Sequence, residues 1–280
     1  MMRFRLKPSR RAAGIALVTG GSSGLGAALC VDLASRGWFV LAASRRATAP
    51  AAAPGVAGRI EAVELDVCRP ESIARLSAQL DDDGRMPELL INCAGINIHG
   101  VFEELSRDQA RAIMDTNFHG VADTLRSFLP AMRERRRGTV LTIGSLAGLL
   151  APPGEALYAA SKHALEGLHE SLHHEVQRFG VRVCLAEPGY IRTDLARSAG
   201  EPAARIADYA RLRPVLHEHW AASIAAGTPV ERAAREILDW AIEGNGFRRR
   251  FGANARWLPW LKAFLPQPMY DAGLRRRFRA

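Results

Sequence analysis

Short apolar segments alternate with helical patterns along most of the chain. Apolar runs of strand length lie at residues 15–19, 38–43, 60–65, 89–92, 139–143 and 181–186. Helical patterns lie between them, most clearly at residues 25–36, 71–80, 108–133 and 158–179. Continuous apolar runs are typical of parallel strands that are covered by helices on both sides. Because parallel strands need right-handed crossovers, the pattern predicts a single-domain α/β fold, a Rossmann-type doubly wound parallel sheet with helices on both faces.

Proline positions and composition refine this organisation. Pro130 lies inside the helical segment at residues 108–133 and is expected to interrupt it, because proline lacks the amide hydrogen and crowds the preceding turn. No repeat or interdomain linker is visible. We therefore expect one domain at residues 14–246, preceded by a basic extension at residues 1–13 and followed by a basic aromatic tail at residues 247–280.

The net charge of +9 comes from the two ends of the chain. Residues 1–13 have five basic groups and no acidic group, and residues 247–280 have a net charge of +8. Subtracting +5 and +8 from the total leaves −4 on residues 14–246. A nucleic-acid-binding domain needs a basic patch on its folded body, so this distribution argues against nucleic acid as a partner.

The sequence lacks the marks of exported, membrane-spanning and metal-binding proteins. No uninterrupted apolar run reaches the roughly 18 residues of a membrane span, and the run near the start is too short for a signal peptide. The four cysteines are isolated in apolar surroundings, which favours a reducing, cytoplasmic location. His169 and His173 have the i, i+4 spacing of metal ligands, but no HExxH motif is present, so we expect no metal site.

A glycine-rich turn joins the first predicted strand to the first predicted helix, with the sequence Thr19-Gly20-Gly21-Ser22-Ser23-Gly24-Leu25-Gly26. Glycines let the backbone approach a phosphate closely, and the free amides of a helix N-terminus favour negative charge. A glycine cluster alone also suits a purely structural turn. Its position between a strand and a helix is the one that a dinucleotide requires, so we predict a dinucleotide-binding turn.

Tyr158 and Lys162 are four positions apart on a predicted helix, so both side chains lie on one face. A phenol with a pKa of roughly 10 is a poor base at neutral pH, but a neighbouring ammonium favours the phenolate and lowers this pKa. Ser145 follows the fifth strand and would face the same crevice, where its hydroxyl can polarise a carbonyl or stabilise an alkoxide. A Tyr-Lys pair alone also occurs on ordinary exposed helices. With Ser145, the pair predicts acid–base chemistry on a carbonyl or its alcohol.

The TGxxxGxG spacing of the glycine turn resembles the short-chain dehydrogenase/reductase family, and further matches follow in order. These are Asp66-Val67, Asn92-Cys93-Ala94-Gly95, the set Asn117, Ser145, Tyr158 and Lys162, and Pro188-Gly189 with Thr193. The resemblance spans residues 15–194. Residues 156–172, around Tyr158, particularly resemble the steroid and retinoid branch of the family.

The resemblance implies a role for each matched residue. Tyr158 would transfer a proton while a hydride moves to or from the substrate carbon, and Ser145 would bond the substrate oxygen. Lys162 would bond the nicotinamide ribose, and Asn117 would position a water that links Lys162 to solvent. The dinucleotide would contact Gly20, Ser22, Ser23, Gly24, Leu25, Gly26, Arg45, Asp66, Val67, Asn92, Ala94, Gly95, Tyr158, Lys162, Pro188, Gly189, Ile191 and Thr193.

The end of the second strand indicates which dinucleotide binds. The segment Ala43-Ser44-Arg45-Arg46 contains no acidic residue. A carboxylate at this place bonds the ribose hydroxyls of NAD, whereas an arginine pairs with the 2′-phosphate of NADP. The alternative is that both arginines are solvated loop charges. We predict NADP through Arg45, with NAD as the less favoured cofactor.

Residues 195–228 fall where members of the family build a lid over the substrate. Apolar residues of this segment could line a pocket or simply pack the lid onto the core, and they are Tyr209, Leu212, Val215, Leu216 and Trp220. Leu146, Leu149 and Leu150 follow Ser145 and add apolar character. We therefore expect a hydrophobic ketone or aldehyde, or the corresponding alcohol, as the substrate.

The basic aromatic tail at residues 247–280 leaves three possibilities open. It could lie in a membrane interface, with its indoles at headgroup depth and its arginines toward anionic lipid. It could equally cap the substrate pocket or pack in a dimer. Prolines at positions 259, 266 and 268 prevent one continuous helix.

The leading hypothesis is an NADP-dependent carbonyl reductase that forms a homodimer or homotetramer, as members of the family often do. One alternative is an NAD-linked alcohol dehydrogenase that uses the same residues. Another is a dinucleotide-binding sensor or scaffold without turnover. A scaffold has no physical need for all four of Asn117, Ser145, Tyr158 and Lys162, so their joint presence argues against it.

Overall fold

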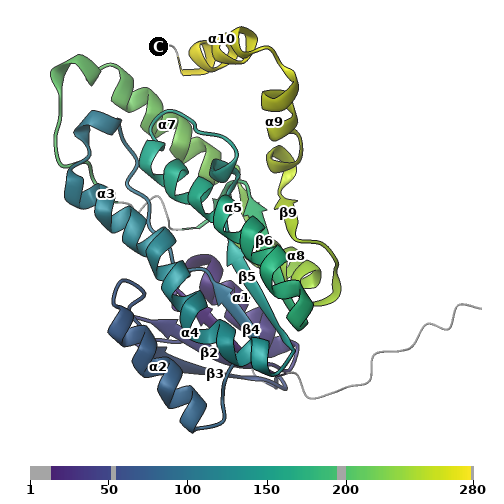
Figure 1. Ribbon diagram of the computed structural model, residues 1–280. Helices are drawn as coiled ribbons and strands as arrows, with labels where there is room; N and C mark the ends of the chain where they lie inside the picture. Colours follow the sequence, from purple (N-terminus) through teal and green to yellow (C-terminus); the bar gives the residue numbers. More distant parts are fainter. Residues whose placement is uncertain (1–13, 52–54, 194–199, 279–280) are drawn as a thin grey trace, which may run out of the picture.

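The computed structural model describes residues 14–51, 55–193 and 200–278. A seven-stranded parallel sheet lies at its centre, in the order β3-β2-β1-β4-β5-β6-β9 (Figure 1). The strands are β1 Ile15–Thr19, β2 Phe39–Ser44, β3 Arg59–Glu64, β4 Leu89–Asn92, β5 Gly138–Ile143, β6 Val181–Pro188 and β9 Arg248–Phe251. A small parallel pair joins β7, Ile191–Arg192, to β8, Thr228–Pro229. The strand order reverses between β1 and β4, which is where doubly wound sheets bind ligands.

Helices cover both faces of the sheet. Successive residues of β1 point to opposite faces, so Ala16 and Val18 join one buried core and Leu17 joins the other. The first core contains side chains of α1 Gly24–Ser35 and α8 Val230–Glu243, and the second contains side chains of α2 Pro70–Asp82, α4 Gly120–Glu134 and α5 Ala156–Val176. This confirms the predicted doubly wound α/β fold. None of the helices that the structure describes is long and apolar enough to cross a membrane.

The long helix expected at residues 108–133 does not break at Pro130. α3, Arg107–Met114, leads into a π-helical turn at Asp115–His119, and α4 then continues through Pro130 to Glu134. Phe128 and Met132 are buried on either side of Pro130, and their packing offsets the hydrogen bond that proline cannot make. The irregularity lies instead in the turn that contains Asn117, and π-helical turns are frequent at functional sites.

The C-terminal segment is not a tail, because its first residues complete the sheet. β9 pairs in parallel with β6 as an edge strand. Arg248 forms ion pairs with Glu166 at 3.0 Å and with Glu187 at 2.9 Å, and Arg250 pairs with Glu187 at 3.3 Å. A run of three arginines has no strand pattern of its own, so only these tertiary partners reveal the strand. Two helices follow, α9 Ala253–Phe264 and α10 Gln267–Phe278. The predicted break occurs at Pro266, between them, whereas Pro259 lies inside α9 and does not interrupt it.

Candidate active site

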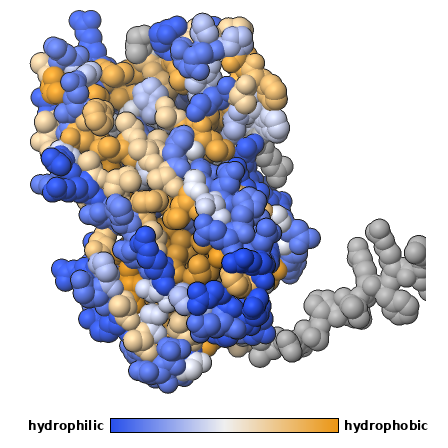
Figure 2. All heavy atoms as spheres, viewed as in Figure 1, coloured by the Kyte–Doolittle hydropathy of each residue, from blue (hydrophilic) through white to orange (hydrophobic). Residues whose placement is uncertain are grey.

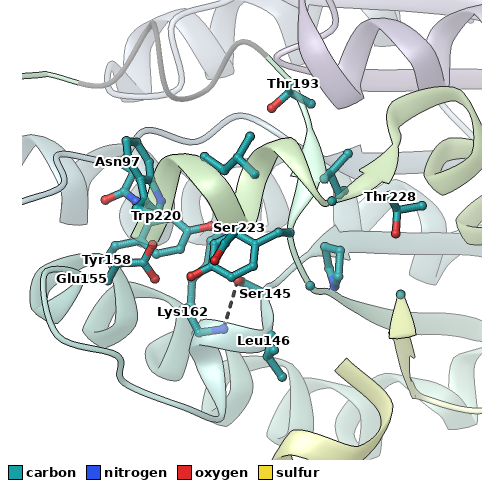
Figure 3. Close-up of a pocket in the computed structure, with 18 of the residues that line it drawn as sticks. Asn97, Ser145, Leu146, Glu155, Tyr158, Lys162, Thr193, Trp220, Ser223 and Thr228 are labelled. Carbon is teal, nitrogen blue, oxygen red and sulfur yellow. Dashed lines mark hydrogen bonds between the residues drawn. The ribbon is translucent and has the colours of Figure 1, made fainter. Parts of the chain in front are cut away.

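A large cleft of about 1220 Å³ opens at the carboxyl ends of the central strands (Figure 3). Its walls come from the glycine turn, the loops after β4, β5 and β6, the start of α5, and α7, Leu212–Ala225. The C-terminal helices α9 and α10 close one side. The cleft therefore joins the predicted dinucleotide turn to the predicted catalytic residues, although these lie far apart in the sequence.

Three glycines shape the turn between β1 and α1. A Cβ atom on Gly26 would lie 2.2 Å from the carbonyl oxygen of Gly20, so this position must be glycine for the turn to fold on itself. Gly24 has a φ of +52°, and among the described residues a Cβ placed there would meet only the Cγ2 of Thr193, at 4.0 Å. The described residues therefore leave space directly over the first residue of α1.

The first turn of α1 fits the pyrophosphate of a dinucleotide. Ser23 is the N-cap residue, but its side chain makes no capping hydrogen bond, so both the hydroxyl and the first helical amides are available to an anion. On the opposite wall, Thr19 Oγ1 accepts hydrogen bonds of 3.1 Å from the amides of Cys93 and Ala94, which fixes the loop after β4. The predicted cofactor residues that line the cleft are Gly20, Ser23, Gly24, Leu25, Gly26, Ala94, Gly95, Tyr158, Lys162, Pro188, Gly189, Ile191 and Thr193.

Ser22 and Arg45 lie outside the lining of the cleft; Ser22 is half-buried and Arg45 is exposed. Arg45 directly follows β2, and the amide of Gly21 donates to the carbonyl of Ala43 at 3.1 Å. This bond holds the end of β2 beside the glycine turn. Arg45 therefore borders the predicted site of the adenosine half.

Three other predicted cofactor residues have structural partners. Asp66 accepts a hydrogen bond of 3.0 Å from the amide of Cys68, and Val67 packs beside Gly120. Asn92 is buried, and its Nδ2 donates to Thr142 Oγ1 at 3.2 Å, which ties β4 to β5. These residues shape the edge of the sheet, and none of the three lines the cleft itself.

Ser145, Tyr158 and Lys162 meet at the centre of the cleft (Figure 3). The hydroxyls of Tyr158 and Ser145 are hydrogen-bonded to each other. The Nζ of Lys162 lies 5.6 Å from the centre of the Tyr158 ring and donates to the carbonyl of Ile143 at 2.8 Å. A serine, a phenol and an ammonium are thus held around one position, as acid–base chemistry on a carbonyl requires.

Burial has the largest effect on the pKa values of Tyr158 and Lys162. It raises the pKa of Tyr158, with a further increase from the nearby Glu155 carboxyl, while the hydrogen bond with Ser145 lowers it only in part. Burial also lowers the pKa of Lys162 to about 8. The expected lowering of the phenol pKa by Lys162 is therefore outweighed in the protein alone, because both groups are buried in a medium that disfavours charge.

Asn117 holds the loop after β4 against α5. Its Oδ1 accepts from the amide of Ile96 at 2.8 Å, and its Nδ2 donates to the carbonyl of Ile96 and to Ser161 Oγ, each at 3.0 Å. The side-chain amide is buried and lies outside the lining of the cleft. The structure thus gives Asn117 a positioning contact with the helix that contains Tyr158 and Lys162.

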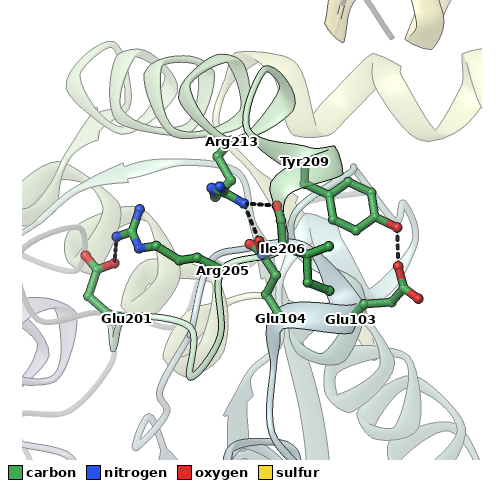
Figure 4. Close-up of polar contacts among 7 residues, drawn as sticks. All are labelled: Glu103, Glu104, Glu201, Arg205, Ile206, Tyr209 and Arg213. Atoms are coloured by element: carbon green, nitrogen blue, oxygen red, sulfur yellow. Dashed lines mark hydrogen bonds and ion pairs between the residues drawn. The ribbon is translucent and has the colours of Figure 1, made fainter.

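The predicted lid is anchored at one point by a buried carboxylate (Figure 4). Glu104 forms an ion pair with Arg213 and accepts a hydrogen bond of 2.8 Å from the amide of Ile206. Tyr209 is hydrogen-bonded to Glu103, away from the cleft. Of the five apolar lid residues named from the sequence, Trp220 lines the cleft; Leu212, Val215 and the others do not. Residues 195–199 of this segment lie outside the described residues.

Several cleft residues were not found from the sequence. The most informative is Glu155, which is only 6% exposed and lies beside Tyr158 and Trp220 (Figure 3). An acidic residue at a helix start looks ordinary in a sequence, so nothing marked it. The C-terminal helices also line the cleft, as one of the three possibilities for this segment, a cap over the pocket, requires; the contributors are Trp257, Leu258, Tyr270, Leu274, Arg277 and Phe278.

His169 is a structural residue. Its Nε2 is hydrogen-bonded to Thr142 Oγ1 at 2.6 Å and its Nδ1 to the carbonyl of Leu165 at 2.9 Å. Burial lowers the pKa of this imidazole to about 4. Both ring nitrogens therefore form hydrogen bonds within the core.

Comparisons with known proteins agree with this geometry. Residues 14–204 match a family described as short chain dehydrogenase. A 3-ketodihydrosphingosine reductase of Bacteroides thetaiotaomicron is 35% identical over 199 residues, covering 70% of this chain and 71% of the relative. Human retinol dehydrogenase 8 is 36% identical over 186 residues, covering 64% and 59%. A short chain dehydrogenase of Burkholderia cenocepacia, solved in complex with NADP, superposes with a TM-score of 0.74 at 28% identity, covering 93% and 97%.

The family match covers the glycine turn, Ser145, Tyr158 and Lys162, and the cleft brings these residues together. The similarity to a retinol dehydrogenase supports the resemblance of residues 156–172 to the steroid and retinoid branch. The protein therefore belongs to the short-chain dehydrogenase family and is an oxidoreductase that uses a nicotinamide dinucleotide.

Proposed function

We propose that the protein is an NADP-dependent reductase of hydrophobic ketones or aldehydes. The observation that supports this most is the meeting of Ser145, Tyr158 and Lys162 in one cleft with the open first turn of α1. The substrate side of that cleft is largely apolar. Its apolar lining includes Leu146, Leu150, Trp220, Trp257 and Leu258.

The residues divide the work of carbonyl reduction among them. The bound dinucleotide supplies the hydride. Ser145 holds the carbonyl oxygen, and Tyr158 donates its phenolic proton to that oxygen as negative charge develops there. The pKa of Lys162 is about 8, so at a lower pH its side chain is a positively charged ammonium. This charge stabilises the neighbouring phenolate that remains after the proton is donated.

Two features of the β2 terminus support NADP over NAD. Arg45 is exposed and borders the glycine turn, so its guanidinium can reach a phosphate on the adenosine ribose. The last residue of β2 is Ser44, and a serine does not repel that phosphate as a carboxylate would.

A fluorescence titration tests this proposal first. Purified protein should bind NADPH at least about tenfold more tightly than NADH, the ratio expected from one charge-assisted contact. With NADPH, a panel of apolar ketones and aldehydes should then be reduced, which the loss of absorbance of NADPH reports. Equal or tighter binding of NADH would replace the proposal with an NAD-linked alcohol dehydrogenase. Binding without turnover of any carbonyl would contradict the assigned reaction.

A further inference from the structure

Glu155 is a buried acid in the substrate half of the cleft. It lies three residues before Tyr158, at the N-cap position of α5, but its carboxyl makes no capping hydrogen bond to that helix. Its side chain instead receives a hydrogen bond from Trp220. Among the residues that the structure describes, no basic side chain forms an ion pair with it. Ionising a buried carboxyl group that accepts only one hydrogen bond costs free energy. The Glu155 carboxylate therefore lacks the positively charged partner that would stabilise it.

The groups around Glu155 do not supply that positive partner. Tyr158 and Tyr190 are phenols; burial raises the pKa of both, and Glu155 raises it further. His99, after β4, stacks on the Trp220 ring at 4.5 Å, and burial lowers its pKa to about 4, so it is neutral.

Two further groups line this end of the cleft from α7 and α10, namely His219 and Arg277. The Arg277 Nε is hydrogen-bonded to His219 Nε2 at 2.6 Å, so this cation already has a partner on α7. Burial and Arg277 both lower the pKa of His219, which favours the neutral form of this imidazole. Arg277 is thus a cation at this end of the cleft, but among the described residues neither it nor any other basic side chain forms an ion pair with Glu155.

We propose that Glu155 is the binding site for a protonated amino group on the substrate, close to the reacting carbonyl. This inference rests on the proposed reductase function and specifies its substrate class as an apolar amino ketone or the corresponding amino alcohol. The ammonium would form a charge-assisted hydrogen bond with the carboxylate, while the apolar walls hold the rest of the molecule. The substrate ammonium would also neutralise the negative charge of Glu155, which disfavours ionisation of Tyr158.

The pairing has a characteristic dependence on pH. Burial raises the pKa of Glu155 to about 7, so the carboxyl is mostly neutral below pH 7 and mostly an anion above it. An ammonium pairs with the anion. Its affinity should therefore increase as the pH rises through about 7, until the amine itself loses its proton. A ketone without the amine should show no such increase.

The test compares a pair of ketones that differ only in an amino group next to the carbonyl. In the unmodified protein the amino ketone should have the higher kcat/KM. Glu155→Gln should lower kcat/KM for the amino ketone about 10- to 100-fold, as expected for a hydrogen bond to a charged group, and change the plain ketone little. Ser223 of α7 also lines the cleft (Figure 3). Ser223→Ala changes no charge, so it is the matched control and should preserve the preference.

Calorimetry provides a second measurement, in which the amino alcohol is titrated into the protein with NADP. The affinity of the unmodified protein for the amino alcohol should increase between pH 6 and pH 8. This increase should be absent in Glu155→Gln. Equal kcat/KM for the two ketones, or equal losses for both in the variant, would overturn the assignment of Glu155. If neither ketone consumed NADPH in the unmodified protein, the proposed function itself would fail instead.

A second, independent observation concerns the outer face of α9. Its exposed apolar residues are Trp257, Trp260, Leu261 and Phe264, at positions i, i+3, i+4 and i+7, with exposed fractions of 50%, 57%, 39% and 74%. This spacing places them in one stripe on the helix. Met269 of α10, 61% exposed, extends the apolar surface, and Figure 2 shows apolar side chains over these helices beside polar ones.

Positive charge accompanies this stripe. Arg275 and Arg276 are exposed on the last turn of α10, and Lys262 is exposed on α9. Trp257 also lines the cleft, so the stripe reaches the mouth of the substrate site. We infer that α9 and α10 rest on an anionic phospholipid surface, with the indoles at headgroup depth, and that an apolar substrate passes from the lipid into the cleft.

Vesicle flotation tests this second inference. The protein should float with vesicles of phosphatidylcholine and phosphatidylglycerol, and less so without phosphatidylglycerol or at high salt. The double variant Trp260→Ser/Phe264→Ser should reduce the bound fraction about tenfold, because it removes most of the stripe. Phe102→Ser, which removes an apolar side chain that is 61% exposed outside these helices, is the matched control. Unchanged flotation of the double variant, or a changed molar mass in light scattering without vesicle binding, would contradict the inference.

Discussion

Replacing Tyr158 with phenylalanine is expected to reduce kcat by about 10²- to 10⁴-fold, the usual contribution of a positioned general acid. The phenolic hydroxyl is the group that touches Ser145 and would protonate the substrate oxygen. Phenylalanine keeps the ring at this half-buried position, so the fold and NADPH binding should change little. Steady-state kinetics with a reducible ketone and a fluorescence titration with NADPH would measure both effects.

Two results would separate the possible outcomes for Tyr158. Turnover at the original rate would refute its role as the general acid. Loss of NADPH binding together with turnover would instead indicate that the substitution damages the cleft. Ser145→Ala is the companion variant, because Ser145 is bonded to the same hydroxyl but is not assigned the proton.

Arg45→Asp is expected to reverse the preference between the two dinucleotides. The substitution removes the proposed partner of the 2′-phosphate and adds an anion that repels it, while a carboxylate there can bond the ribose hydroxyls of NADH. Affinity for NADPH should fall about 10- to 100-fold, the range for a hydrogen bond between charged groups, and affinity for NADH should rise. Fluorescence titrations of the same preparation with both cofactors would show the reversal.

Arg46 provides the matched control for this experiment, since it is the next residue and is also exposed. Arg46→Asp introduces the same change of charge one position away. If it shifts the preference as strongly as Arg45→Asp, the effect is general electrostatics and not a specific contact. Raising the ionic strength should weaken a general effect more than a close pair.

Local patterns were enough to predict the first six strands of the sheet. Residues 15–19 and 89–92, for example, are continuous apolar runs, and such runs have few alternatives to a buried strand. The seventh strand, β9, could not be predicted, because its arginines are stabilised by Glu166 and Glu187 from distant parts of the chain. Pro130 failed as a helix-breaking signal for a similar reason, since packing of Phe128 and Met132 decides whether the helix continues.

The catalytic residues could be identified from the sequence because they either lie close together in the chain or directly follow a predicted strand. Tyr158 and Lys162 share a helix face, and the glycine turn and Ser145 each follow a strand, so one sheet edge collects them all. Glu155 was not visible in this way. A glutamate at the start of a helix is ordinary in solvent and becomes unusual only when α7 and its Trp220 bury it.

Periodicity, glycine spacing and the Tyr-Lys interval thus determine the fold class and the reaction type, because both depend on backbone geometry that short segments encode. The protonation of Tyr158 and Lys162, the position of Glu155 and the use of α9 and α10 as a wall of the cleft follow only from the folded molecule. Burial and charge are properties of the surroundings of a residue, and those surroundings come from segments that lie far away in the chain.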